Sequence, residues 1–331
     1  MKILTVVVPL YKVEKFINKC LDSLILPDEQ MKLIEVLVVN DGTPDNSAIM
    51  AKEYENKYPE TFRVIDKENG GHGSAWNVGV NEATGKYLRF LDSDDWLTNF
   101  SEFVSFLSNF DVDLIFTGLD EYYQDTNRHV IYKFDAMIPN RVYAVSDFDW
   151  AKTGNCYNGY NLTNFHTCTY RTSLLKKYSP LFYEKMYYDD EILFVMPLCT
   201  SHSFAYCDIV LYNYLLGREG QTMDPKVALR NVDFKIKIRK YEIDFVNSHP
   251  VVYPKVKEKL FSILESRCRN TVDYISRLPY NECKVKMDDW SHFLKINFPL
   301  FKGNLKYKLY NVLPYCLYKA LFDLYDKKIM L

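Results

Sequence analysis

The sequence predicts an α/β fold built on an open, doubly wound sheet with helices on both faces. Between residues 3 and 118, short β-branched runs alternate with longer amphipathic stretches. The β-branched runs are continuously apolar rather than alternating, as is typical of parallel strands that are covered on both faces. The regular succession of strand and helix indicates βαβ units. We therefore expect a Rossmann-like, mostly parallel sheet.

Five runs are expected to form the strands of this sheet. They span residues 3–8, 34–39, 62–65, 87–91 and 113–117. The first run follows a single lysine and has no small-residue cleavage site after it, so we interpret it as a buried strand and not as a signal peptide. Apolar residues at helical spacing predict a helix over 16–24, and a second helix, capped by Asp45 or Ser47, should end near Tyr58.

Composition narrows the class of protein. The chain has 331 residues and a formal net charge of −2, which gives no field to attract a phosphate backbone, so nucleic acid is not expected as a partner. Its eight cysteines form no C-x-x-C pair, which favours a reduced, cytoplasmic compartment. No apolar run reaches the roughly 18 residues that a membrane-spanning helix needs.

Three regions are expected along the chain: 1–120 and 121–224 as two halves of one catalytic domain, and 225–331 as a helical region. The βαβ period is lost after residue 121, and lysine-, glutamate- and leucine-rich stretches predict helices over 229–246 and 256–275. From Lys302 onward the chain is basic and amphipathic. Two interpretations of this tail remain open: contact with a membrane surface or a partner, or a terminal helix packed on its own domain with solvated lysines.

Polar residues follow the expected strands at the edge where α/β sheets bind ligands. Pro9-Leu10-Tyr11 follows the first strand, Asn40-Asp41-Gly42 the second, a glycine-rich run over 67–73 the third, and Asp92-Ser93-Asp94-Asp95 the fourth. No G-x-G-x-x-G fingerprint and no Walker loop follows any of them. Carboxylates one residue apart, such as Asp92 and Asp94, can share a hard divalent cation, which could bridge a diphosphate.

The order of these motifs resembles that of a known family. The sequence is similar over about residues 4–216 to the inverting nucleotide-sugar glycosyltransferases of family two, which have the type-A glycosyltransferase fold. The resemblance rests on VPLYKVE (8–14), VNDGT (39–43), NGGHGSAWNVG (69–79), FLDSDDW (90–96) and YYDDE (187–191).

The resemblance implies a set of donor-binding residues. Pro9, Tyr11, Glu14 and Asp41 would surround the base, usually uracil, with Asp41 accepting a hydrogen bond from a ring N–H. The 67–73 run would approach the sugar or the diphosphate through its members Lys67, Asn69 and Gly71. Asp92 would lie near the ribose and the metal, and Asp94 would bind the metal, Mn²⁺ or Mg²⁺.

Catalysis by inversion needs a base at the acceptor hydroxyl, and Asp190 resembles the family's base. Asp189 is the alternative, because the run Asp189-Asp190-Glu191 permits a shift of one residue. His166 could be a third metal ligand or a structural histidine, and the glycines around His72 would let a ligand approach. Arg218 could touch the diphosphate or the acceptor. Trp76 departs from the family, which often has arginine there.

We expect a metal-dependent enzyme that transfers one sugar, from a UDP-linked donor, onto a hydroxyl of a glycan or lipid-linked acceptor in cell-surface polysaccharide synthesis. A catalytically silent nucleotide-sugar-binding or scaffold protein is the alternative from another class. A sugar-phosphate nucleotidyltransferase ranks lower, because it would need a glycine-rich basic loop where Pro9-Leu10-Tyr11 stands.

Overall fold

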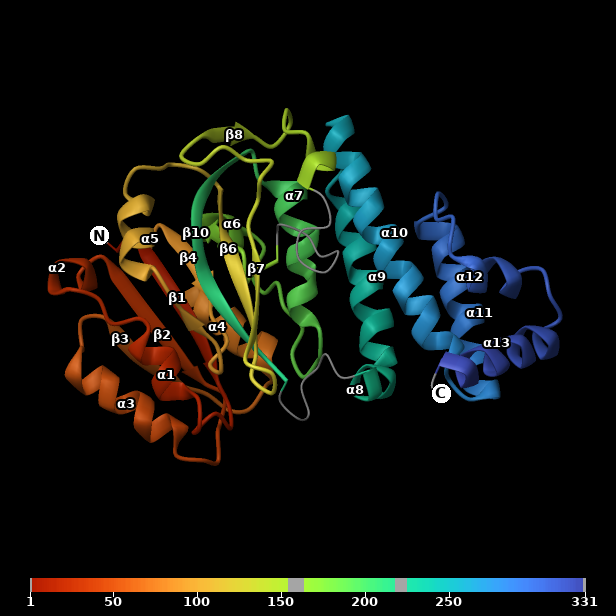
Figure 1. Ribbon diagram of the computed structural model, residues 1–331, viewed down its shortest axis with the longest axis horizontal. Coiled ribbons are helices and arrows are strands. Elements are labelled where there is room, and N and C mark those ends of the chain that lie inside the picture. The colour runs from red at the N-terminus through yellow and green to blue at the C-terminus, as the bar shows by residue number, and fades with distance from the viewer. Residues whose placement is uncertain (1, 154–163, 218–224, 330–331) are drawn as a thin grey trace. The chain divides into compact units, whose positions relative to one another are not determined.

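The computed structural model describes residues 2–153, 164–217 and 225–329, which form two compact units. The N-terminal unit runs from Met1 to Glu219 and the C-terminal unit from Gly220 to Leu331. Figure 1 shows that the strands belong to the first unit and that the described part of the second is helical. Within the described residues, no helix is long and apolar enough to cross a membrane.

The first half of the sheet is parallel. The central strand β1 pairs with β2 on one side and with β4 on the other, and β2 pairs with β3. These four strands are β1 (Leu4–Leu10), β2 (Ile34–Asn40), β3 (Phe62–Asp66) and β4 (Tyr87–Phe90). Every residue of β1 and β2 is buried, as expected from their continuous apolar runs. The predictions of these four strands are confirmed.

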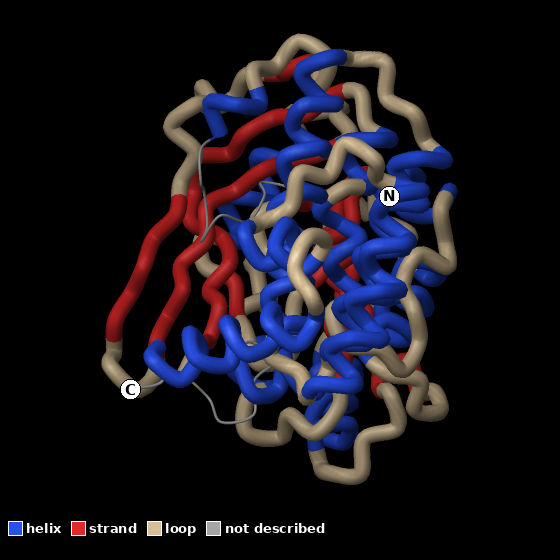
Figure 2. The backbone as a smooth tube through the Cα atoms, turned by 90° about the vertical axis from the view of Figure 1, so that its right-hand side faces the viewer, coloured by secondary structure: helices blue, strands red, loops and turns tan. Residues whose placement is uncertain are grey.

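The second half of the sheet is mixed. The full strand order is β3-β2-β1-β4-β9-β6-β10-β5, in which β9 runs antiparallel to both of its neighbours and β6 runs parallel to β10. Figure 2 shows the longer strands side by side. The remaining strands are β5 (Trp96–Leu97), β6 (Leu114–Tyr123), β7 (Arg128–Tyr132), β8 (Val142–Ala144), β9 (Cys168–Arg171) and β10 (Ser203–Leu216). The predicted α/β fold and the fifth predicted strand, within β6, are confirmed.

Helices surround the sheet of the N-terminal unit. They are α1 (Ile17–Asp22), α2 (Asp28–Met31), α3 (Ser47–Lys57), α4 (His72–Glu82), α5 (Phe100–Leu107), α6 (Thr172–Lys177) and α7 (Met196–Thr200), with the 3₁₀ turns η1 (Trp150–Thr153) and η2 (Asp189–Phe194). Helix α4 lies directly on β1 and β2. Gly79 permits this close approach, because a Cβ there would lie only 2.2 Å from Cγ1 of Val7.

The C-terminal unit is built from helices α8 (Pro225–Arg230), α9 (Val232–Ser248), α10 (Pro254–Ser276), α11 (Tyr280–Asn297), α12 (Leu305–Tyr310) and α13 (Tyr315–Ile329). Helices α9 and α10 confirm the two helices predicted from the sequence. Their contact buries apolar side chains such as Ile238, Leu264 and Cys268, together with the carboxylate of Glu242. The three regions expected from the sequence, with boundaries at 120 and 224, stay a prediction.

Candidate active site

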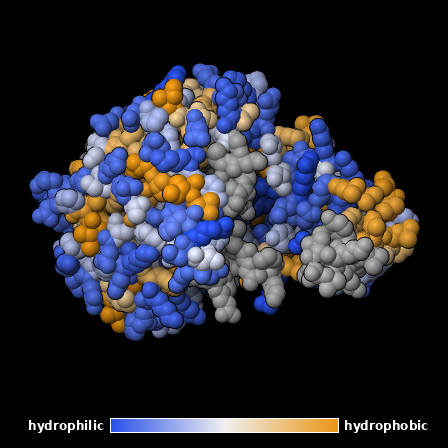
Figure 3. All heavy atoms as spheres, in the orientation of Figure 1, coloured by the Kyte–Doolittle hydropathy of each residue, from blue (hydrophilic) through white to orange (hydrophobic). Residues whose placement is uncertain are grey.

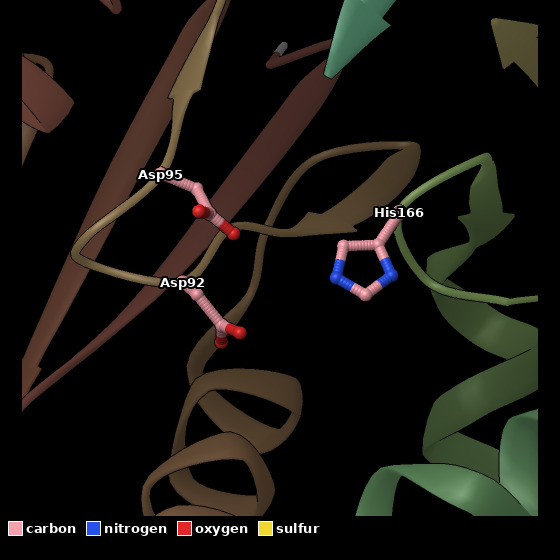
Figure 4. Close-up of side chains that lie close together, drawn as sticks. All are labelled: Asp92, Asp95 and His166. Carbon is pink, nitrogen blue, oxygen red and sulfur yellow. The ribbon is translucent and has the colours of Figure 1, made fainter. Parts of the chain in front are cut away.

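The turn that follows β4 brings acidic residues to the carboxyl end of the parallel strands. Asp92 and Asp95 come from this turn, and His166 comes from the loop before β9 (Figure 4). Each offers one possible ligand atom, and these atoms all lie within 4.8 Å of one another. Two carboxylates and an imidazole form a donor set that suits a divalent cation such as Mn²⁺.

Tyr212 on β10 fixes the geometry of the acidic turn. Its hydroxyl donates to Oδ2 of Asp95 at 2.6 Å and accepts the backbone N–H of Asp92 at 3.2 Å. The other oxygen of Asp95 accepts the N–H of Leu215 at 2.8 Å. Burial, followed by the neighbouring charge of Asp92, holds the pKa of Asp95 well above its ordinary value. A cation would relieve this electrostatic cost, so the donor set fits a metal.

His166 is buried and neutral. Its Nδ1 lies 2.7 Å from the amide oxygen of Asn164, so this nitrogen carries the proton and Nε2 keeps its lone pair. Burial lowers the pKa of His166 to about 3. The His166 carbonyl accepts a hydrogen bond from the guanidinium of Arg89, which also donates to Oγ1 of Thr169 at 2.8 Å. A neutral imidazole held in place is a good metal ligand.

Asp94, the other predicted metal ligand, is half-buried in the same turn, but it is not one of the three clustered residues. The structure therefore brings Asp92 together with Asp95 and His166, while the role of Asp94 stays a prediction. From the sequence, Asp95 looked like a continuation of the acidic turn. The position of the Asp95 carboxylate is fixed by the hydrogen bond from Tyr212, which lies 117 residues away along the chain.

The predicted base-binding residue Asp41 holds the glycine-rich loop. At the end of β2, its Oδ1 accepts hydrogen bonds from Nζ of Lys67 at 2.6 Å and from the N–H of Gly70 at 2.8 Å. Its Oδ2 accepts the N–H of Gly71 at 2.8 Å, and its carbonyl accepts the Asn69 side chain at 2.9 Å. The structure thus brings four predicted donor-site residues together, and three donors, from Lys67, Gly70 and Gly71, bond the Asp41 carboxylate.

The loop after β1 is joined to the loop after β2. Pro9 is buried in β1, while Tyr11 is 43% exposed at its end. The Glu14 backbone N–H donates to Asp45 at 3.1 Å, and its carboxylate accepts the side chain of Asn46 at 3.0 Å. Asp45 also accepts the N–H of the first α3 residue at 3.2 Å. Glu14 therefore orders the loop that carries Tyr11, and any contact with a donor stays a prediction.

His72 connects the two predicted halves of the site. Its Nε2 lies 3.2 Å from Oδ1 of Asp92 and its Nδ1 lies 3.4 Å from Oδ2 of Asp189. Burial opposes protonation of this ring, but Asp189 and Asp92 together outweigh burial and hold the pKa of His72 well above its ordinary value. About a third of the side chain, 35%, is exposed, so solvent screens part of this effect.

The two candidate bases differ in their surroundings. Asp189 is 3% exposed at the start of η2 and faces both His72 and α4, where a Cβ on Gly73 would lie 2.4 Å from Asp189 Oδ2. Asp190 is half-buried. Burial first, and then the charges of Asp95, Asp92 and Asp190, raise the pKa of Tyr214, so this tyrosine lies within electrostatic range both of the acidic turn and of Asp190.

Trp76, where the family often has arginine, is part of the core. It is fully buried, stacks on Phe90 with ring centroids 4.1 Å apart, and contacts Phe165 and Phe182 edge to face. It therefore packs α4 against the sheet and presents nothing to a diphosphate. Arg218, the other residue considered for that contact, lies outside the described residues.

This mixed sheet, with an acidic turn at the carboxyl end of its fourth strand, has the architecture of the type-A glycosyltransferase fold. The family model described as glycosyl transferase family 2 matches residues 5–178, and the chain belongs to this family. It is 44% identical over 94 residues to the glycosyltransferase GlyA of Streptococcus pneumoniae, a match that covers 28% of this chain and 13% of GlyA. The chain thus spans a small part of that relative.

Solved structures support the same fold. Residues 1–349 of TarS from Staphylococcus aureus, crystallised in complex with UDP-GlcNAc, match with a TM-score of 0.62 and 22% identity, over 85% of this chain and 83% of that one. The mannosyltransferase PcManGT from Pyrobaculum calidifontis, in complex with GDP-Man and Mn²⁺, matches with a TM-score of 0.53 and 14% identity, over 98% and 87% of the two chains. These two structures show the fold, and the activity, donor and acceptor of this chain are matters of proposal.

Proposed function

We propose that this glycosyltransferase moves one sugar from a UDP-linked donor to a hydroxyl of a glycan or lipid-linked acceptor, with inversion at the anomeric carbon. The observation that carries the proposal is the position of His72, which lies 3.2 Å from Asp92 and 3.4 Å from Asp189. One side chain thus spans the distance from the predicted donor turn to Asp189, the neighbour of the predicted base Asp190. A sugar bound between them would have its leaving group and its acceptor on opposite sides.

Recognition of the donor is assigned to the loops after β1, β2 and β3. Tyr11 is exposed and could stack on a base, and Asp41 lies beside it at the same sheet edge, as the parallel pairing of β1 and β2 requires. The complex of TarS with UDP-GlcNAc supports a uridine nucleotide, while the GDP-Man complex of PcManGT makes guanosine the competing choice. Binding of UDP but not GDP, measured by calorimetry, would support our assignment.

Asp92 and His166 are proposed to hold a divalent cation, Mn²⁺ or Mg²⁺, together with a second carboxylate of the turn. Such a cation would neutralise the negative charge that develops on a departing nucleoside diphosphate. The geometry favours Asp95 as that carboxylate, and the sequence favours Asp94. Asp94→Asn and Asp95→Asn separate the two hypotheses: the variant that loses Mn²⁺ affinity without unfolding identifies the ligand.

Asp190 is proposed as the base. Its carboxylate takes the proton of the acceptor hydroxyl while that oxygen bonds to the anomeric carbon and the bond from this carbon to the diphosphate oxygen breaks. Asp189 suits this role less well, because it is almost fully buried and one of its oxygens faces His72. We propose that Asp189 and His72 keep the base and the acidic turn at a fixed separation.

The reaction can be tested by incubating nucleotide sugars with Mn²⁺ and acceptor mixtures and measuring release of nucleoside diphosphate. Asp190→Asn should retain UDP binding and lose turnover, because it removes the base and leaves the donor loops intact. Glu191→Gln, one residue along the same turn, is the matched control and should retain turnover. Full activity of Asp190→Asn would overturn the base assignment, and no release from any donor would overturn transfer.

We also place the reaction in a reduced compartment, on the cytoplasmic side of a membrane where lipid-linked acceptors are available. All seven cysteines in the described part of the chain are free thiols. This is the state expected where disulfides do not persist. Fractionation of cells followed by detection of the chain tests this placement, and recovery outside the cell would contradict it.

A further inference from the structure

The last two helices of the C-terminal unit are oriented against the usual rule for surface helices. On α12, Lys306 is 9% exposed while the adjacent Leu305 is 66% exposed. On α13, Lys319 is 5% exposed while Leu317 and Leu321 are 58% and 47% exposed. Surface helices normally bury leucine and expose lysine, so both helices present an apolar face outward.

Specific contacts hold the two helices in this orientation. Nζ of Lys306 donates to Oγ of Ser276 at 3.1 Å and lies 3.6 Å from Oδ1 of Asp273. Nζ of Lys319 donates to the carbonyl of the same Ser276 at 3.0 Å. Both lysines are therefore tied to the end of α10, and rotating either helix to bury its leucines would break these bonds. These contacts therefore fix the orientation in which the leucines of both helices are exposed.

Lysines outnumber acidic residues in the segment that carries the exposed apolar side chains, since six lysines face two aspartates from Lys302 to Leu331. Leu300 and Val312 are 70% and 72% exposed in the segments that flank α12. Figure 3 shows apolar atoms gathered at this end of the C-terminal unit. Residues 295–322 contain five lysines and no aspartate or glutamate, although the whole chain has a net charge of −2. Three of these lysines are exposed: Lys295, Lys302 and Lys308.

We propose that the α12–α13 face, defined by Leu300, Leu305, Val312, Leu317 and Leu321 with the exposed lysines Lys295, Lys302 and Lys308, docks on an anionic phospholipid bilayer. Leucines that enter the interfacial region bury apolar area, and lysines around them pair with anionic headgroups. The exposed apolar side chains of the face are thereby covered. This inference does not depend on the identity of the donor or of the metal.

A second copy of the chain is a less suitable partner for this face. In a symmetric dimer the same patch meets itself, so the exposed lysines of one copy would approach those of the other. Residues 295–322 contain no acidic side chain, and Asp288, which accepts the hydroxyl of Tyr310 on α12, is already paired with Lys284. A bilayer that contains anionic lipid is complementary to both the apolar and the charged part of the face.

Flotation of the full chain with lipid vesicles tests the proposal without donor or metal. The chain should float with vesicles of phosphatidylglycerol and phosphatidylethanolamine, and much less with vesicles of phosphatidylcholine. The triple variant Leu305→Ser/Leu317→Ser/Leu321→Ser should lose partitioning by about tenfold or more for each leucine that enters the bilayer. The variant Lys302→Gln/Lys308→Gln should lose about fivefold for each lysine at low salt.

A matched control removes exposed apolar residues from the other unit. Ile49 and Ile131 are 63% and 60% exposed, so Ile49→Ser/Ile131→Ser makes a comparable change without touching the α12–α13 face. This control should float like the wild type, and all variants should keep the wild-type melting temperature. Wild-type flotation of the triple leucine variant would overturn the proposal. The proposal would also be overturned if the chain bound no vesicles and instead formed a dimer, seen by light scattering, that the leucine changes abolish.

Discussion

At the residue scale, Arg89 shows how the candidate metal site is positioned from inside the sheet. It lies in β4, is fully buried, and donates to the carbonyl of His166 and to Oγ1 of Thr169. Burial lowers the pKa of Arg89 to about 10, so the guanidinium still carries its charge at neutral pH. Its donors therefore fix the loop that supplies His166, without contact with any ligand being needed.

Replacing Arg89 should affect metal binding as well as stability. Arg89→Met leaves the His166 carbonyl without this donor, at a cost of about 1–3 kcal/mol for a buried group. Loss of such support to a ligand typically weakens metal binding by about 10–100-fold. Mn²⁺ titration should show this loss, with partial recovery in Arg89→Lys. Thr169→Val, which removes only the other acceptor, is the control, and unchanged Mn²⁺ affinity in folded Arg89→Met would refute the positioning role.

His166 should make the metal-free protein sensitive to acid. Its pKa is about 3 in the folded state and about 6.5 in an unfolded chain, so the unfolded chain binds the extra proton between these values. Stability should fall as pH drops from about 6.5 towards 3, by up to roughly 1.4 kcal/mol per pH unit from this group. Denaturant unfolding at several pH values should show a smaller decline for His166→Asn. Parallel curves for the two proteins would contradict the assignment.

Single residues also show the limit of prediction from sequence. Asp92 and Asp41 were identified because each follows a strand that the apolar pattern defines. Tyr212 and Arg89 were missed because each lies within a strand, where local sequence marks it only as a core position. Tyr212 bonds to Asp95, 117 positions away, and Arg89 bonds to the carbonyl of His166, 77 positions away. No local sequence pattern encodes such contacts.

At the element scale, α4 positions the segment that leads to the candidate base. The Asn77 side chain accepts the N–H groups of Leu181 and Phe182 at 3.0 and 3.1 Å, and donates to the Phe182 carbonyl at 2.7 Å. Ser74 donates to Glu184 at 3.1 Å. Since α4 itself rests on β1 and β2, these bonds transmit the position of the sheet to η2.

Asn77→Ala should therefore disturb catalysis beyond its effect on folding. Three buried backbone groups lose their partner, and each costs about 1–3 kcal/mol if it finds no other. We expect kcat to fall by more than tenfold, with UDP binding nearly unchanged, because the donor loops do not depend on this residue. Asn81→Ala, at an exposed position of the same helix, removes only the acceptor of the Ser179 hydroxyl and is the control. Equal losses in kcat for both variants would show that Asn77 has no special role.

The strands illustrate which elements a sequence defines. The parallel strands β1 to β4 were predictable because burial on both faces demands continuous apolar runs. The short β9 was not predicted, since Cys168-Thr169-Tyr170-Arg171 carries no such run, and its antiparallel insertion between β4 and β6 is a long-range pairing. The mixed half of the sheet could therefore be recognised only from the structure.

At the scale of the whole molecule, the C-terminal unit has a charged core of its own. Glu242 is fully buried between α9 and α10, where it accepts Nε of Arg267 at 3.1 Å and also pairs with Arg239. Burial, followed by the charge of Arg267, lowers the pKa of Arg239 to about 10, so the Arg239 guanidinium remains charged at neutral pH and depends on this carboxylate. The ion cluster lies entirely within the C-terminal unit.

Glu242→Gln should selectively weaken this unit. Removing one partner of a buried ion cluster typically costs about 3–5 kcal/mol, because the remaining charges lose their compensation. Hydrogen exchange should then accelerate in α9 and α10 while β1 and β2 keep wild-type protection. Glu258→Gln, at an exposed position of α10, serves as the control and should leave exchange unchanged in both units. If β1 and β2 also lost protection, the two units would unfold as one cooperative body, and the stability of the donor site would depend on the helical unit.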